Sequence, residues 1–322
     1  MDVVHSLTQI PHDPNSVVTV GMFDGVHRAH QQILGELLKR SQERRGRSVV
    51  ITFDPHPKEV LGGRGSALKL LTTFDERVNL IKEHGIDFLY VINFTWEFSR
   101  LAAEEFYRSY IIDGIGVSEV VVGYDHMFGK DRSAGLADLQ AMGQKYHFSV
   151  VSIPALSVDG EVVSSTKIRK ALFAGDVMKA SAMLGRPYNL SGEVIRGDRR
   201  GKLLGIPTAN LRPLSAEKLI PANGIYFVRV KSARWLSYGM LSIGTRPTFS
   251  TDDKQTIEVH VFGINENLYG ELLTIEFIQR LRDERKFNSP EELVQQIRKD
   301  QEQCEALLKQ MEITEKSLSN SN

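Results

Sequence analysis

The chain has 322 residues, and its 40 basic and 40 acidic side chains cancel to a formal net charge of zero at pH 7. That length predicts two domains, and the balanced charge gives no long-range attraction toward nucleic acid or an anionic membrane. No basic leader precedes an apolar run, and no stretch approaches the roughly 20 apolar residues of a membrane span. We therefore expect a cytoplasmic protein with neither kind of partner.

In the first half, short β-branched runs alternate with amphipathic segments. The runs predict strands at 17–22, 49–53, 88–94, 120–123 and 149–153, and the segments between them predict helices closing near Gly46 and over 74–84, 101–112 and 136–146. This alternation predicts a Rossmann-like parallel sheet with helices on both faces. Ligands of such sheets gather outside the carboxyl ends of the strands.

The segment 21–30 follows the first predicted strand and leads into a helix. Free backbone N–H groups at such a turn face an anion, and the helix dipole favours negative charge there. His27 and His30 are three residues apart, share a helix face, and are expected to reach one phosphate chain. The alternative is an ordinary pair of capping and surface histidines, because neither a Walker loop nor a dinucleotide fingerprint is present.

A second helix start lies at 164–169, where hydroxyl groups and a guanidinium suit phosphate contacts. The alternative is a capped helix without a ligand. One more helix is expected to start at Asp176 and end near Gly185, where we expect the domain boundary.

After Gly185 the pattern changes to strand-like runs at 188–195, 224–230, 236–243, 256–262 and 272–277, with turn residues between them. Such runs predict a small antiparallel β-barrel. From Ser289 the chain is expected to form a helix whose packing positions are Leu293, Ile297 and Leu307. Cys304, the single cysteine, falls in this charged helix and cannot pair within the chain, which suits a reducing cytosol.

A glycine-punctuated basic segment at 197–202 precedes Pro207, Thr208, Ala209 and Asn210. We expect a rigid turn that presents the Thr208 and Asn210 oxygens to Mg²⁺, a hard ion that keeps waters and binds substrate phosphates. The alternative for the glycine segment is a solvated β-turn.

Glu258 lies in a strand-like run and, by alternation, shares a face with Thr256 and His260. The opposite face carries Ile257, Val259 and Val261. Glu258 is either an exposed strand carboxylate or a general base that takes the proton of an attacking hydroxyl.

Taken together, segments 21–30, 52–57, 123–129 and 164–169 resemble the nucleotidylyltransferase module of the bacterial bifunctional riboflavin kinase/FMN adenylyltransferases, also called FAD synthetases. Segments 197–211, 244–249, 256–260 and 268–270 resemble the riboflavin kinase module of the same family. The resemblance implies an adenylyltransferase domain at 1–185 and a kinase domain at 186–322. The reactions would convert riboflavin and ATP to FMN, and FMN and ATP to FAD and pyrophosphate.

The resemblance also implies the site residues. The adenylyltransferase would bind ATP through Gly21, Phe23, Asp24, His27, His30, Ser165, Thr166 and Arg169, with Asp125 and Phe128 near the flavin. The kinase would bind nucleotide through Gly197, Arg199, Gly201, Lys202, Thr208 and Asn210. Thr208 and Asn210 would organise Mg²⁺, and Glu258 would activate the ribityl 5′-hydroxyl of riboflavin.

Family members usually carry glycine where this chain has Ala29. A methyl group there would crowd a phosphate if the turn needs the conformational freedom of glycine. The alternative function is therefore a riboflavin kinase with weakened or lost adenylyltransferase activity. A non-catalytic flavin or nucleotide sensor is a third hypothesis, from a different class.

Overall fold

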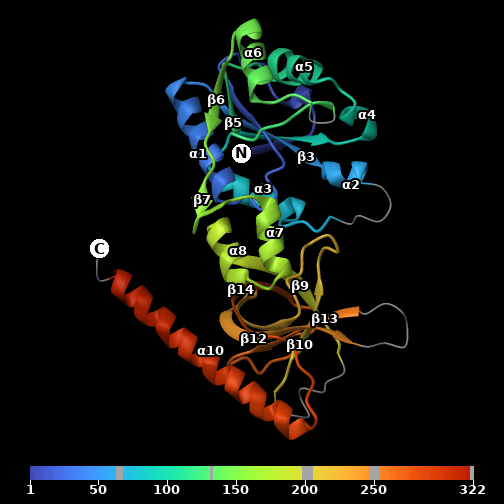
Figure 1. The fold of residues 1–322 in the computed structure, drawn as a ribbon, viewed down its shortest axis with the longest axis vertical. Coiled ribbons are helices and arrows are strands. Elements are labelled where there is room, and N and C mark those ends of the chain that lie inside the picture. The colour runs from blue at the N-terminus through green and yellow to red at the C-terminus, as the bar shows by residue number, and fades with distance from the viewer. Residues whose placement is uncertain (63–67, 131–132, 198–205, 247–253, 320–322) are drawn as a thin grey trace. The chain divides into compact units, whose positions relative to one another are not determined.

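The computed structural model describes residues 1–62, 68–130, 133–197, 206–246 and 254–319 (Figure 1). Arg199, Gly201 and Lys202 of the predicted kinase loop lie outside these ranges. The chain divides into two compact units, Met1–Lys167 and Ile168–Asn322, and each is described by itself. The functional boundary after residue 185 stays a prediction.

The first unit contains a six-stranded parallel sheet in the order β1-β4-β3-β2-β5-β6. Its strands are β1 (Asp2–Val4), β2 (Val17–Val20), β3 (Ser48–Asp54), β4 (Phe88–Asn93), β5 (Glu119–Gly123) and β6 (Ser149–Ile153). Five of the six strands were predicted, because β-branched runs suit a sheet buried on both faces. The short edge strand β1 was not.

Helices cover both faces of this sheet and enclose two separate cores. α1 (Arg28–Glu43) and α3 (Phe74–Lys82) supply Leu34, Leu37 and Ile81 to one core. The other core receives residues of α5 (Ala103–Phe106), the π-helical η2 (Tyr107–Ile115) and α6 (Leu136–Tyr146). The predicted helix 101–112 thus starts later and runs further. It passes Gly114 and stops at Gly116, whose φ of 83° is left-handed.

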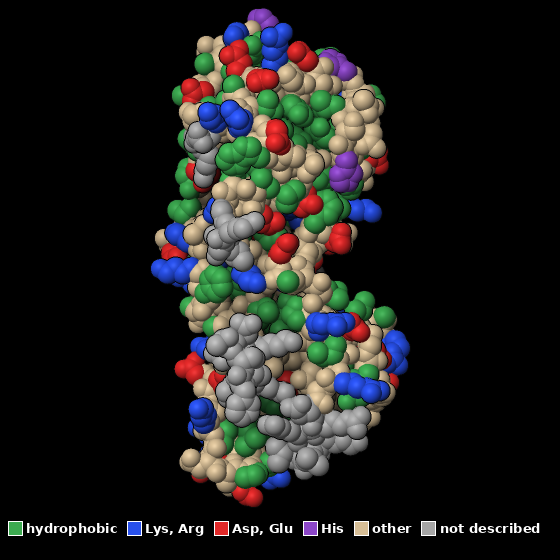
Figure 2. All heavy atoms as spheres, turned by 90° about the vertical axis from the view of Figure 1, so that its right-hand side faces the viewer, with side chains coloured by type: hydrophobic (Ala, Val, Ile, Leu, Met, Phe, Trp, Pro, Cys, Tyr) green, Lys and Arg blue, Asp and Glu red, His purple; other side chains and the backbone are tan. Residues whose placement is uncertain are grey.

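Smaller elements complete this unit. They are η1 (Leu7–Gln9), α2 (Pro57–Leu61), α4 (Trp96–Ser99) and the hairpin of β7 (Ser157–Val158) and β8 (Glu161–Val162). Basic and acidic side chains are scattered over the face drawn in Figure 2. In the described part of the chain, no helix is both long and apolar enough to cross a membrane.

α7 (Ser165–Phe173) spans the division between the units and is followed by α8 (Val177–Leu184). As predicted, α8 is capped by Asp176, whose side chain accepts from the Lys179 N–H, and it ends at Gly185 in a left-handed conformation. α8 packs against β14 of the barrel that follows.

The second unit is a closed antiparallel barrel in the order β10-β13-β12-β11-β14-β9. Its strands are β9 (Tyr188–Ile195), β10 (Ala209–Pro213), β11 (Gly224–Lys231), β12 (Leu236–Arg246), β13 (Lys254–Val261) and β14 (Leu272–Arg282). β10 corrects the sequence analysis, which placed Asn210 in a turn. The segment is a strand because β9 and β13 pair with it on either side and close the barrel.

The long helix α10 (Pro290–Ser319) packs against the barrel (Figure 1). Two of its predicted packing positions, Ile297 and Leu307, contact a buried cluster of Phe227, Met240 and Cys304. Cys304 is therefore a core residue, although its sequence neighbours are charged. Burial, with the nearby carboxylates as a smaller cause, raises the pKa of its thiol to about 12, so the thiol stays protonated.

Candidate active sites

The turn between β2 and α1 has an unusual backbone. Phe23, Gly25 and Val26 have φ values of 51°, 86° and 37°, all in the left-handed region. A Cβ added to Gly21 would lie 3.1 Å from the ring of Phe23, which folds back over it. Non-glycine residues hold such angles only where their surroundings impose them. The turn is therefore a fixed structure, as an anion-binding turn requires.

The buried carboxylate of Asp24 anchors this turn. Its carboxylate is 2% exposed and accepts hydrogen bonds from the Leu71 and Thr72 N–H groups at 3.0 Å and from the Thr72 hydroxyl at 3.1 Å. The Thr72 hydroxyl oxygen also accepts from the Gly25 N–H at 3.0 Å. Asp24 thus fastens the turn to the segment before α3. Its contact with a nucleotide stays a prediction.

His27 and His30 lie together at the start of α1. His27 caps the helix, because its Nδ1 accepts from the His30 N–H at 3.3 Å. The two rings stack with centroids 3.6 Å apart, and the Phe23 ring packs edge-on against His30 at 5.1 Å. Burial, and secondly the proximity of His27, hold the pKa of His30 well below its usual value. The pair predicted from the sequence is thus formed, with His27 as the cap and not inside the helix.

The second predicted helix start meets the same turn. The Ser165 hydroxyl at the start of α7 donates to the backbone oxygen of Asp24 at 2.9 Å, and the Ser164 hydroxyl caps the helix by accepting from the Lys167 N–H. Thr166 is exposed, and Arg169 follows Ser165 by one helical turn. The fold therefore brings Ser165 to the histidine-bearing turn. The roles of Thr166 and Arg169 stay predictions.

The predicted flavin contacts follow β5 at the carboxyl edge of the sheet. Asp125 is exposed there, whereas Phe128 is 7% exposed and packs against Tyr107 with ring centroids 4.7 Å apart. The sequence analysis missed the two large exposed side chains beside Asp125, which are Tyr124 and Met127. Phe128 is a core residue in this structure, and its contact with flavin stays a prediction.

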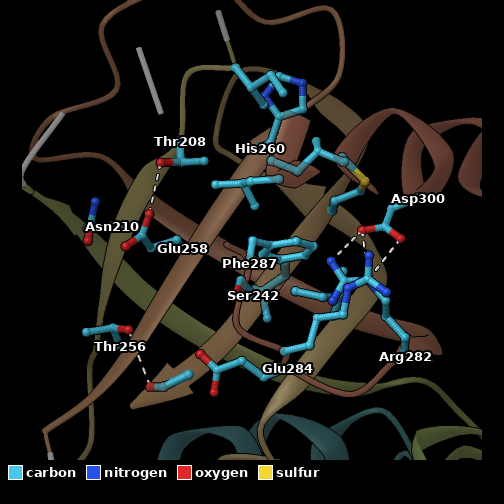
Figure 3. A pocket seen from close by; sticks show the side chains of 18 of the residues that line it. Thr208, Asn210, Ser242, Thr256, Glu258, His260, Arg282, Glu284, Phe287 and Asp300 are labelled. Atoms are coloured by element: carbon cyan, nitrogen blue, oxygen red, sulfur yellow. Dashed lines mark hydrogen bonds and ion pairs between the residues drawn. The ribbon is translucent and has the colours of Figure 1, made fainter. Parts of the chain in front are cut away.

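In the barrel, two cavities share an edge. The first, of about 440 Å³, lies beside β12, β13 and α10 and includes Met240, Ser242, Glu258, His260, Glu284, Phe287 and Ile297 (Figure 3). The second, of about 600 Å³, is lined by Gly197, Pro207 and the segment 264–269, among others. Thr208 and Asn210 line both cavities.

Glu258 stands at this shared edge. As the alternation predicted, its face of β13 borders the first cavity while Ile257, Val259 and Val261 are buried on the other. Glu258 pairs with Asn210 across the β10–β13 ladder, and its Oε2 accepts from the Thr208 hydroxyl at 3.1 Å (Figure 3). A carboxylate, a hydroxyl and an amide therefore meet where the two cavities join.

Gly197 is required by the same arrangement. A Cβ at this position would lie 2.1 Å from Nδ2 of Asn210, so only glycine lets the amide occupy its place. Gly197 also lines the second cavity, and its contact with a nucleotide stays a prediction.

Residues 9–167 match the family model for FAD synthetase, and residues 184–308 match the model for riboflavin kinase. A bifunctional riboflavin kinase/FMN adenylyltransferase of Listeria monocytogenes is 35% identical over 93% of this chain and 95% of its own length. The Escherichia coli protein of that name is 33% identical over 92% and 94%. The chain belongs to this bifunctional family.

A solved structure agrees with this assignment of the fold. The crystal structure of a protein described as a macrolide-efflux protein from Streptococcus pneumoniae is 32% identical, has a TM-score of 0.85, and covers 94% of this chain and 97% of its own. The description concerns that protein alone. Because residues 9–167 match the FAD synthetase model, this family member retains the first module.

The riboflavin kinase module holds an ion pair that the sequence did not reveal. Arg282, at the end of β14, donates to Asp300 of α10 through Nε at 3.0 Å and Nη2 at 2.7 Å (Figure 3). Gln296 donates to the same carboxylate at 2.8 Å. Both charged residues line the first cavity. No periodic pattern links a strand end to a helix position eighteen residues later. The pairing of Arg282 with Asp300 therefore could not be predicted from the sequence.

The donor set at the shared edge fits Mg²⁺. In the residues that the structure describes, no three His, Cys, Asp or Glu side chains gather to hold a metal. Mg²⁺ usually takes only one or two protein oxygens and completes its shell with water and phosphate. The Thr208 hydroxyl and the Asn210 amide oxygen are such ligands, and they border both cavities.

Proposed function

We propose that this chain phosphorylates riboflavin with ATP to give FMN and then transfers the adenylyl group of a second ATP to FMN, releasing pyrophosphate. The observation that carries the kinase assignment is the meeting of Thr208, Asn210 and Glu258 where two cavities join. Family membership supports both activities.

In the kinase, riboflavin would occupy the 440 Å³ cavity and ATP the 600 Å³ cavity. Apolar side chains of the first cavity, among them Met240, Phe287 and Ile297, suit a flat aromatic ring system. Riboflavin would then lie with its ribityl end toward Glu258. The γ-phosphate of ATP would approach from the opposite side of Thr208 and Asn210, as an in-line transfer requires.

Glu258 takes the proton of the ribityl 5′-hydroxyl as that oxygen attacks the γ-phosphorus, and ADP leaves. Thr208, which donates to the Glu258 carboxylate, fixes the orientation of this base. Mg²⁺ held by Thr208 and Asn210 would supply charge neutralisation to the ATP phosphates.

In the adenylyltransferase, the turn 21–30 and the start of α1 would hold the ATP phosphates. The stacked His27 and His30 and the helix dipole face the charge that builds up when an FMN phosphate oxygen attacks the α-phosphorus. The depressed pKa of His30 keeps its ring neutral at pH 7, so it acts as a hydrogen-bonding group without a fixed charge. Ser165 ties a second helix start to this turn.

The position of Ala29 supports retention of adenylylation. Ala29 lies in the first turn of α1, whereas the left-handed residues of the turn are Phe23, Gly25 and Val26. Glycine's conformational freedom is therefore not needed at position 29.

The proposed cytoplasmic location is supported by the free, buried Cys304.

The test is a time course with purified protein, riboflavin, ATP and Mg²⁺, in which FMN and FAD are separated chromatographically. FMN should appear first and FAD should follow. A parallel reaction with FMN and ATP tests adenylylation alone. FMN without any FAD at high enzyme concentration would favour the kinase-only alternative, and neither product would refute the proposal.

A further inference from the structure

His260 makes one contact that the proposed mechanism does not use. Its Nδ1 lies 2.8 Å from the backbone oxygen of Pro207. His260 stands two residues after Glu258 on the same face of β13 and lines the first cavity (Figure 3). A carbonyl oxygen only accepts, so Nδ1 carries the proton and donates it.

The barrel ladder explains why this contact matters. β10 begins at Ala209, which pairs with Val259, and Asn210 pairs with Glu258. Thr208 and Pro207 therefore lie beyond the last backbone pair of this ladder. Proline has no N–H, so the ladder cannot be extended by a backbone donor from Pro207. The His260 ring supplies a side-chain bond at the place where the backbone bonds stop.

Thr208 is thus held from both sides. Its C-terminal neighbours are held by the ladder, and its N-terminal neighbour Pro207 is held by His260. Its own hydroxyl donates to Glu258 at 3.1 Å. β13 therefore carries both Glu258, the proposed base, and His260, which fixes the segment that holds the Thr208 hydroxyl.

We propose that His260 is a positioning residue of the kinase: its Nδ1–H anchors Pro207 and so holds Thr208 against Glu258 at the edge shared by the two cavities. This inference rests on the proposed function, in which Thr208 helps to bind Mg²⁺ and ATP. It assigns His260 a role through the protein backbone and not through contact with riboflavin.

Two substitutions separate these roles. The side-chain amide of asparagine can place its Nδ2–H where histidine has Nδ1–H, whereas leucine fills similar space without a donor. His260→Asn should therefore keep the anchor, and His260→Leu should lose it. A direct contact between the imidazole ring and riboflavin would be lost in both variants.

The first measurement is hydrogen–deuterium exchange of the segment 206–211 in the full chain without nucleotide or metal. His260→Leu should speed the exchange of the Ala209 and Asn210 amides, at the start of the β10 ladders, about three- to tenfold, the effect of losing one hydrogen bond, and His260→Asn should stay within about twofold of the wild type. Equal exchange in all three proteins would overturn the inference.

The second measurement is steady-state riboflavin phosphorylation. In His260→Leu, the Mg²⁺ concentration for half-maximal rate and the KM for ATP should rise about tenfold, because a mispositioned ligand weakens metal binding. The KM for riboflavin should change little, and His260→Asn should restore the wild-type values. FMN adenylylation in the same sample is the internal control for folding and concentration.

The outcomes are distinguishable. A raised riboflavin KM in both variants would show a ring contact and overturn the positioning role. If Thr208→Val left FMN formation unchanged, the proposed metal site would fail, whereas a wild-type-like His260→Leu beside an impaired Thr208→Val would overturn the His260 inference alone.

Discussion

Replacing Asp300 with alanine removes the carboxylate that joins α10 to the end of β14. The Asp300 side chain is 4% exposed and its partner Arg282 is 19% exposed, so the variant leaves a largely buried cation without its partner. Breaking such a pair from one side costs about 3–5 kcal/mol. The partial exposure of Arg282 lets water compensate, so we expect the lower end, about 3 kcal/mol.

For a unit of the size of Ile168–Asn322, about 3 kcal/mol corresponds to a fall in Tm of about 6–12 °C. Melting can be followed by differential scanning calorimetry of the full chain, because the emission of Trp235 would respond to the control variant: its indole N–H donates to Glu266 at 3.0 Å. The matched control is Glu266→Ala, which breaks an exposed pair with Arg234 and should cost less than about 1 kcal/mol.

If Asp300→Ala lowers the Tm no more than Glu266→Ala does, the buried pair does not contribute the expected stability. A second variant separates the loss of the ion-pair attraction from the cost of leaving Arg282 buried and unpaired. Arg282→Met combined with Asp300→Leu removes both charges and should recover much of the loss, because replacing a buried pair by apolar groups is often neutral.

Three further predictions concern the other described sites. Because the pKa of His30 is lowered on folding, its stabilising contribution is full above about pH 6.5 and is lost as the pH falls below that value; His30→Gln should flatten the acid side of a Tm–pH curve. Gly197→Ala should displace the Asn210 amide and reduce FMN formation at least tenfold, measured with saturating riboflavin, while adenylylation continues. Ser165→Ala removes the hydrogen bond to the Asp24 backbone, costs about 1 kcal/mol, and should slow FAD formation without affecting FMN formation.

Controls follow from the same structure. Gly35→Ala places a methyl group in open space within α1 and should leave both activities intact, so a similar effect of Gly35→Ala and Gly197→Ala would contradict the role of the Asn210 contact. An unchanged acid limb in His30→Gln, or slowed FMN formation in Ser165→Ala, would contradict the other two predictions.

The sequence predicted the fold best where a periodic pattern was long. Glu258 is the clearest case, because buried Ile257, Val259 and Val261 fix the face on which it lies. The strand β10 could not be found this way, since Pro207 made Thr208, Ala209 and Asn210 resemble a turn. It is a strand only because the barrel has to close between β9 and β13.

The burial of Cys304 could have been predicted from its helical spacing. It lies seven residues after Ile297 and three before Leu307, which places all three on one helix face. Charged neighbours hid this spacing. The burial of Phe128 and the anchoring of Asp24 by Leu71 and Thr72 are different, because both depend on segments far apart in the sequence.

Glu258→Gln shows whether the chain carries two independent ATP-dependent centres. The isosteric variant keeps an acceptor for Thr208 but removes the base, so FMN formation from riboflavin should fall by a factor of about 10²–10⁴. FAD formation from supplied FMN should match the wild type in the same preparation. Undiminished FMN formation, or parallel loss of both activities in a folded variant, would contradict the account.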